Sequence, residues 1–221
     1  MSDWQWFQDF NLEAKQRGDD VPNRLLQIHE QGFQMRETNP DQTLALFAEG
    51  QRVAKGYGHP WWVLLFAQWQ VHGMIYYKRD QRSILDNAVQ NLLTVRKPVY
   101  ADYPQRLRVA SDLITIYQCV DPLGYEEEIR AAITYLENEV SAEESDGRYM
   151  LQSNKINFAL VRNRLDEATD LTLTAQGWLE ADPDRYNAGH YRVDFTAYPA
   201  LIAFRKRDWT ELAVRRESPR R

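Results

Sequence analysis

Few residues of this chain have the type and spacing that chemistry requires. Its one cysteine, Cys119, excludes an internal disulfide and offers no cysteine cluster for a metal. Because Cys119 lies in the apolar run 113–120, we expect a buried, unreactive thiol rather than a nucleophile. The acidic runs 126–128 and 143–144 are typical of helix first-turn charge and of a solvated loop. A phosphate-binding glycine loop, an H-E-x-x-H pattern and a nucleophile elbow do not occur in the sequence. We therefore expect no catalytic residue, no cofactor and no metal.

One spacing keeps an enzymatic alternative open. The segments Arg24–His29 and Arg185–His190 both have the pattern R-x4-H. This pattern resembles the signature of a helical ribonuclease family, the HEPN nucleases, which implies RNA cleavage. That family usually has a polar residue directly after the arginine, where this chain has Leu25 and Tyr186. A short pattern of this kind also arises by chance in a chain with many arginines, so it is a hypothesis only.

Composition favours an ordinary globular protein. The 221 residues are 43% hydrophobic and 27% charged. The formal net charge of -5 and the pI near 5.5 disfavour a general nucleic-acid binder, which usually carries a basic surface. Nucleic acid is therefore an unlikely partner, although local basic patches are compatible with this charge.

The sequence contains no targeting or membrane signal. Residues 1–6 have neither a basic region nor an apolar core, so they do not form a signal peptide. The longest apolar run, 61–67, is far shorter than the roughly 20 residues that span a bilayer. We expect a cytoplasmic protein that does not enter the membrane.

An amphipathic helix is predicted at the N-terminus. Ser2 and Gln5 form a candidate capping box, and Trp6, Phe7 and Phe10 make an apolar stripe at helical spacing. The helix should end near residues 18–20. Its aromatic residues must pack against a surface. That surface is either the first end of a helical array or another chain.

From Val21 onward, the sequence predicts helices in pairs. Asn39 is a good N-cap, Pro40 suits the first helical position, and Gln42 completes a capping box. Glycine, proline and aspartate separate the remaining segments. The predicted helices cover about 22–37, 40–55, 60–78, 81–96, 104–120, 124–140, 147–162, 164–182, 186–206 and 209–214.

The third of these helices carries a repeat-like motif. Trp69, Gly73 and Tyr76 follow the pattern W-x2-H-G-x2-Y, with His72 in the remaining marked position. The tetratricopeptide repeat begins W-x2-L-G-x2-Y, so the chain resembles that family at three of four positions. Further matches in register are Leu85, Val89 and Leu92, and Ala168 to Ala175 in a later pair. We expect the tryptophan and tyrosine to bury one helix face and the glycine to let the second helix approach closely.

The resemblance implies an all-α fold, a right-handed superhelical array of antiparallel helix pairs (an α-solenoid). It would contain about five pairs plus the N-terminal helix. We predict an N-terminal helix packed on the array at 1–20, the repeat domain at 21–214 and a flexible tail at 215–221. Predicted pair starts near 60, 104 and 147 are farther apart than the family's usual ~34 residues, so its helices should be longer.

The resemblance also implies a binding groove along the first helix of each pair. Aromatic side chains beside Arg and Lys could hold an acidic or C-terminal peptide through charge-assisted hydrogen bonds and apolar contact. The alternative is a groove surface that is solvated or packed on itself. The predicted groove residues are His29, Phe33, Arg36, Gln70, Tyr77, Lys78, Arg108, Ser111, Asn157 and Arg205.

Three functions fit these observations. The first is a non-enzymatic scaffold or adaptor that binds a peptide or helix of another protein. The second is a regulatory or nucleic-acid-acting module that presents arginines to RNA, and the third is the repeat portion of a multidomain regulator. Acidic residues such as Glu37 and Asp112 interleaved with the groove cations would favour the first over the second. Assembly of identical chains, through the N-terminal helix or the C-terminal end, is a further option.

Overall fold

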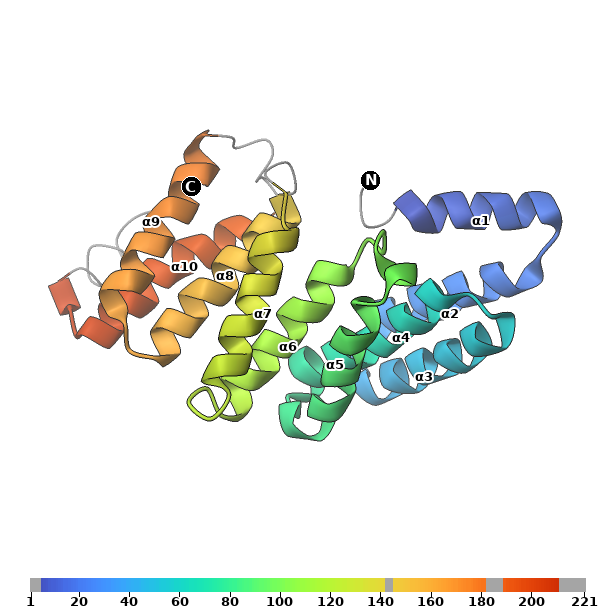
Figure 1. The fold of residues 1–221 in the computed structure, drawn as a ribbon, viewed down its shortest axis with the longest axis horizontal. Helices are drawn as coiled ribbons and strands as arrows, with labels where there is room; N and C mark the ends of the chain where they lie inside the picture. The colour runs from blue at the N-terminus through green and yellow to red at the C-terminus, as the bar shows by residue number, and fades with distance from the viewer. Residues whose placement is uncertain (1–4, 142–144, 182–188, 211–221) are drawn as a thin grey trace. The chain divides into compact units, whose positions relative to one another are not determined.

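The protein is built from α-helices (Figure 1). The computed structural model describes residues 5–141, 145–181 and 189–210, and no strand occurs in these ranges. This confirms the all-α prediction. In the same ranges, no helix combines the length and the apolar composition that crossing a bilayer requires.

The chain separates into two compact units, Met1–Val120 (unit 1) and Asp121–Arg221 (unit 2). The division of the chain into segments 1–20, 21–214 and 215–221 stays a prediction. The helices of unit 1 are α1 (Gln5–Arg17), α2 (Asp20–Met35), α3 (Pro40–Tyr57), α4 (Pro60–Gly73), the π-helix η1 (Met74–Lys78), α5 (Gln81–Val95), the 3-10 helix η2 (Pro98–Tyr100) and α6 (Arg106–Val120). Those of unit 2 are α7 (Glu126–Glu139), α8 (Ser145–Val161), α9 (Leu165–Ala181) and α10 (Gly189–Lys206).

Local signals place the helix ends where the sequence predicted them. The side chain of Asn39 accepts a hydrogen bond from the Gln42 amide at 3.2 Å, and Pro40 is the first residue of α3. Asp80 caps α5 in the same way through the Ser83 amide. Gly58 ends α3 at φ 79°, a left-handed conformation that glycine adopts without steric strain. The predicted helix 209–214 and tail 215–221 lie, beyond Thr210, outside the described residues.

Three of the turns between helices have the same backbone geometry. Arg79, Asn163 and Arg207 all have a φ between 56° and 58°, and they follow η1, α8 and α10. After α8 and α10 the turn is a Schellman motif, because Arg164 donates to the Ala159 carbonyl and Asp208 donates to the Ala203 carbonyl. By subtraction, Arg207 follows Asn163 by 44 residues and Asn163 follows Arg79 by 84, about twice that interval.

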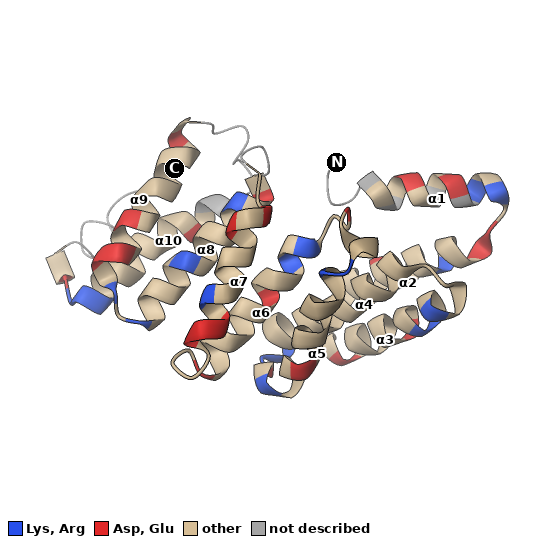
Figure 2. Cartoon of the chain, viewed as in Figure 1, with Lys and Arg blue, Asp and Glu red and all other residues tan. Residues whose placement is uncertain are grey.

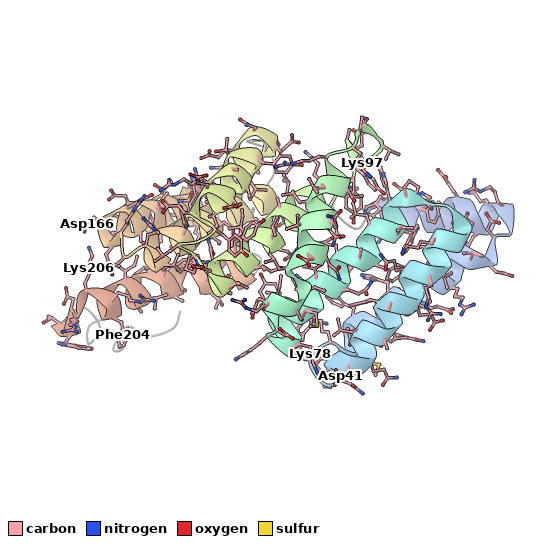
Figure 3. The ribbon with its side chains drawn as sticks, turned by 60° about the horizontal axis from the view of Figure 1, so that its bottom comes forward. Asp41, Lys78, Lys97, Asp166, Phe204 and Lys206 are labelled. Carbon is pink, nitrogen blue, oxygen red and sulfur yellow. The ribbon has the colours of Figure 1, made fainter. Side chains whose placement is uncertain are left out.

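An ion pair accompanies each of these three turns, and Figure 3 labels the residues of two of them, Lys78 with Asp41 and Lys206 with Asp166. The cation directly before the left-handed residue pairs with an acid in the first turn of the preceding helix. Surface pairs of this kind stabilise a protein little, so their value is as markers of equivalent geometry. The pairs are Lys78–Asp41 at 2.6 Å, Arg162–Glu126 at 2.7 Å and Lys206–Asp166 at 2.8 Å.

Close helix contacts in unit 1 depend on glycine. A Cβ at Gly32 of α2 would lie 2.5 Å from Cε1 of Phe47 on α3, and one at Gly50 of α3 would lie 2.5 Å from Cζ of Phe66 on α4. Both rings are fully buried. α3 therefore packs closely against α2 and α4. Direct contacts also join α2 to α4, through Phe33 and Trp69, and α4 to α6, through His72 and Asp112.

The motif glycine is close to a neighbouring helix, but not to the predicted one. A Cβ at Gly73 would lie 2.9 Å from Cδ2 of Leu44, which is on α3 of the preceding pair rather than on α5. In α5, Leu92 is buried, but at the two earlier predicted positions Leu85 and Val89 are only partly buried, and their neighbours Ile84 and Ala88 are buried instead. The π-helical turn between Gly73 and α5 changes the residue count on which that prediction depended.

The N-terminal helix packs on unit 1 itself. The Trp6 ring is 5% exposed and lies edge-on to Trp61 and Trp62, at 5.8 and 5.5 Å between ring centroids. Phe10 lies 4.6 Å from the His59 ring. The side chain of Phe7, the third aromatic residue of the predicted stripe, lies outside the described residues. The aromatic stripe therefore has a surface within its own chain, through Trp6 and Phe10.

The contact at Gly50 yields a stability prediction. We expect Gly50→Ala to lower the free energy of unfolding by about 1–3 kcal/mol, because the Phe66 ring is fully buried and must shift. Gly177→Ala in α9 is the matched control, since its Cβ would meet no atom within 4 Å. It should raise stability by up to about 1 kcal/mol through helix propensity. Urea denaturation of both variants measures the difference, and equal shifts would refute the close approach of α3 and α4.

Candidate functional site

Five ring-bearing residues of unit 1 form a continuous series, which we call the aromatic row: Phe33, Trp69, His72, Tyr76 and Tyr77. Phe33 on α2 lies edge-on to Trp69 on α4, with 5.5 Å between ring centroids. Trp69 lies 5.0 Å from His72, and His72 lies 4.4 Å from Tyr76 on η1. Tyr77 is 6.1 Å from His72. The row therefore crosses from α2 to the end of α4.

The π-helix presents Tyr76 at the surface. The sequence predicted that Trp69 and Tyr76 bury one helix face, but only Trp69 is buried and Tyr76 is 47% exposed. The hydroxyl end of Tyr76 lies against α6, where it is hydrogen-bonded to Thr115, and desolvation there raises the pKa of the phenol. In η1 the Asp80 amide donates to the Met74 carbonyl, six residues back, whereas the equivalent bonds after α8 and α10 span five. The extra residue changes the direction of the side chains that follow Gly73.

A polar pair joins the aromatic row to α6. Nδ1 of His72 is 3.3 Å from Oδ1 of Asp112 on α6. Asp112 is 3% exposed, and its Oδ2 atom has no hydrogen-bond partner. The pair joins α4 to α6 and aligns the His72 ring between Trp69 and Tyr76. Neither residue was predicted as a site residue, although a histidine in the usual leucine position and an aspartate among apolar α6 residues were visible signals.

Two of the predicted groove cations, Arg36 and Lys78, are paired with acidic residues. The Arg36 guanidinium lies 3.9 Å from the Phe33 ring centroid, donates to the Phe33 carbonyl at 2.6 Å and pairs with Glu37 at 3.4 Å. Burial raises the pKa of Tyr77, and the nearby Arg36 opposes this rise. Lys78 pairs with Asp41 at 2.6 Å. Acidic side chains thus neutralise Arg36 and Lys78 locally.

Two predicted groove residues lie elsewhere. His29 is 4% exposed among the rings of Phe33, Phe47, Phe66 and Trp69, so it belongs to the core. Gln70 donates hydrogen bonds to Gln51 on α3 and to the Phe66 carbonyl, so it faces α3 rather than the aromatic row.

The remaining predicted residues divide between α6 and unit 2. Arg108 is within electrostatic reach of the Tyr76 phenol, and the Ser111 carbonyl accepts a hydrogen bond from Thr115. Asn157 on α8 is hydrogen-bonded to Tyr198, and Arg205 is exposed on α10. Phe33, Arg36, Tyr77 and Arg108 therefore lie at or near the aromatic row, whereas Asn157 and Arg205 belong to unit 2.

Among the described residues, those considered for catalysis do not form a site with one another. Arg24 is exposed and pairs with Glu49 at 2.7 Å, whereas His29 is in the core, so the first R-x4-H pattern has no shared surface. The residues of Arg185–His190 lie outside the described side chains. Cys119 is exposed, contrary to the prediction of a buried thiol, because the last turn of α6 reaches the surface. Desolvation by its neighbours raises the pKa of the Cys119 thiol, which disfavours the nucleophilic thiolate.

Comparison with known proteins gave no relative: no family model, no curated protein and no solved structure matches this chain. Among the described residues, no group of three or more His, Cys, Asp or Glu side chains could hold a metal ion.

The buried His29 predicts a pH dependence of stability. Burial lowers the pKa of His29 from 6.5 to about 4, so the unfolded chain binds a proton at a higher pH than the folded protein does. The free energy of unfolding therefore has its full value above pH 6.5 and falls by about 3 kcal/mol as the pH drops to about 4. We expect His29→Leu to remove this slope in urea denaturation between pH 7 and pH 4. An unchanged slope would show that other groups cause the loss.

The His72–Asp112 pair predicts strong energetic coupling. His72→Leu, which introduces the usual motif residue, removes the hydrogen-bond partner of the buried carboxylate and should cost roughly 2–4 kcal/mol. The double variant His72→Leu/Asp112→Ala should regain much of that loss, because no buried charge is left. Denaturant unfolding of the two single variants and the double variant measures the coupling. Additive effects would contradict a direct interaction.

Proposed function

We propose that this chain is a tetratricopeptide-like helical-repeat scaffold that binds a segment of another protein on the aromatic row of unit 1. Internal repetition supports the repeat assignment. The left-handed residue, the cation before it and the acid of the preceding helix recur together at three turns. The proposal includes a right-handed superhelical arrangement of the pairs and a cytoplasmic location.

The half-exposed Tyr76 carries the binding proposal. Its ring lies on His72, which in turn contacts Trp69, so Tyr76 has a rigid support of packed rings. Tyrosine combines a large apolar ring with a polar hydroxyl and loses few rotamers on binding, which makes it a frequent anchor in protein interfaces. A packed aromatic surface beside partly exposed Arg36 suits a peptide or a helix with both apolar and polar side chains.

Charge distribution supports a protein partner over RNA. Acidic and basic segments lie near one another on many of the helices (Figure 2). Near the aromatic row, Glu37 pairs with Arg36 and Asp41 pairs with Lys78. A nucleic-acid surface instead requires cations that remain available to phosphates. The RNA alternative therefore has less support than the peptide alternative.

Capture experiments test this function. The full-length protein, immobilised and exposed to lysate from its native cells, should retain a partner protein, and purified partner should then be titrated against variants. We expect Tyr76→Ala to weaken binding tenfold or more, the usual loss for an aromatic anchor, without a large change in melting temperature.

The matched control is Leu93→Ala on α5. Leu93 is 52% exposed, similar to Tyr76, but it lies on α5, which contributes no residue to the aromatic row. We expect this variant to bind as the wild type does. If Leu93→Ala weakened binding and Tyr76→Ala did not, the partner would bind at α5 rather than on the aromatic row, and the proposal would be rejected.

A further inference from the structure

The carboxylate of Asp112 is buried but only half satisfied. Its Oδ1 atom is 3.3 Å from Nδ1 of His72, whereas Oδ2 has no hydrogen-bond partner although Asp112 is 3% exposed. Native proteins seldom leave a buried carboxylate oxygen without a donor, because water would otherwise solvate it strongly. Oδ2 therefore identifies a place where a donor or a positive charge is required.

The surroundings of Oδ2 favour a cation. His72 contacts the carboxylate directly, and Tyr76 and Tyr77 lie within electrostatic reach of it. Aromatic faces attract ammonium and guanidinium groups, and the attraction grows when the cation is desolvated. The cations Arg36 and Lys78 already have partners, Glu37 and Asp41. Arg108, on the same helix as Asp112, is also within electrostatic reach of the Tyr76 phenol.

We propose that Asp112 forms a subsite for one Lys or Arg side chain of the bound segment. The cationic group pairs with Oδ2, and its methylene stem lies along the rings of Tyr76 and His72. Tyr76 is half exposed and lies within electrostatic reach of the carboxylate, so its ring marks the side from which the cation approaches Asp112. This inference rests on the proposed function and specifies one residue type of the partner.

Small cations test the subsite without knowledge of the partner. The full-length protein is titrated with n-butylammonium or methylguanidinium chloride, at constant ionic strength, while NMR follows the ring signals of His72 and Tyr76. We expect saturable shifts with both cations. n-Butanol and butyrate, which have a similar size but no positive charge, should cause no saturable shift. Equal responses to butylammonium and butanol, or no response to either cation, would mean that water or a proton satisfies Asp112 and would overturn the proposal.

Two variants identify which carboxylate binds the cation. Asp112→Asn should weaken cation binding at least tenfold, whereas Asp41→Asn, which alters an exposed acid paired with Lys78, should leave it unchanged. A larger effect at Asp41 would overturn the proposal, and the probe comparison in the wild type remains decisive if Asp112→Asn fails to fold. If partner capture depends on Tyr76 but the protein responds equally to the charged and uncharged probes, only the subsite is rejected. If the protein responds only to the charged probes and Tyr76→Ala does not weaken the binding of any partner, only the scaffold function is rejected.

Discussion

The contact of phenylalanine rings with glycines sets the geometry of unit 1. Phe47 lies over Gly32, and Phe66 lies over Gly50, so α3 approaches α2 and α4 to a distance that a Cβ atom would prevent. Because α2 and α4 are held by the same helix, Phe33 and Trp69 meet with 5.5 Å between their ring centroids. The aromatic row thus depends on Gly32 and Gly50, although neither glycine is part of the row. A binding surface on packed helices needs this kind of support, since its side chains must be fixed before a partner arrives.

Within each unit, a polar pair links one helix to the next helix but one. His72 on α4 pairs with Asp112 on α6, and in unit 2 Tyr149 on α8 donates to Asp194 on α10. In each unit an aspartate on the later helix accepts from a ring on the earlier one. Such pairs contribute modestly to stability but constrain how neighbouring helices are rotated, because an incorrect rotation leaves a buried polar group without a partner. The same requirement explains why unpaired Oδ2 of Asp112 is informative.

Sequence reasoning predicted helix positions well because their signals are local. Asn39, Pro40 and Asp80 act within one turn of their own helices, so caps and breaks could be assigned without tertiary information. Rotation about the helix axis could not be assigned, since it depends on contacts between distant segments. His29 is therefore in the core and Gln70 faces α3, although both were expected in the groove. The π-helical turn, the exposed Cys119 and the buried Asp112 could not be assigned from the sequence for the same reason.

The π-helical turn has an evolutionary consequence. Removal of one residue from a regular α-helix rotates everything that follows by about 100°, which usually disrupts a core. Between Met74 and Lys78, however, the chain holds one residue more than the equivalent turns after α8 and α10. A deletion there would restore ordinary helical geometry and leave α5 in its register, while it would redirect Tyr76 and Tyr77. Insertions and deletions at this point could thus alter what the surface recognises without altering the fold, which gives related sequences a simple route to new partners.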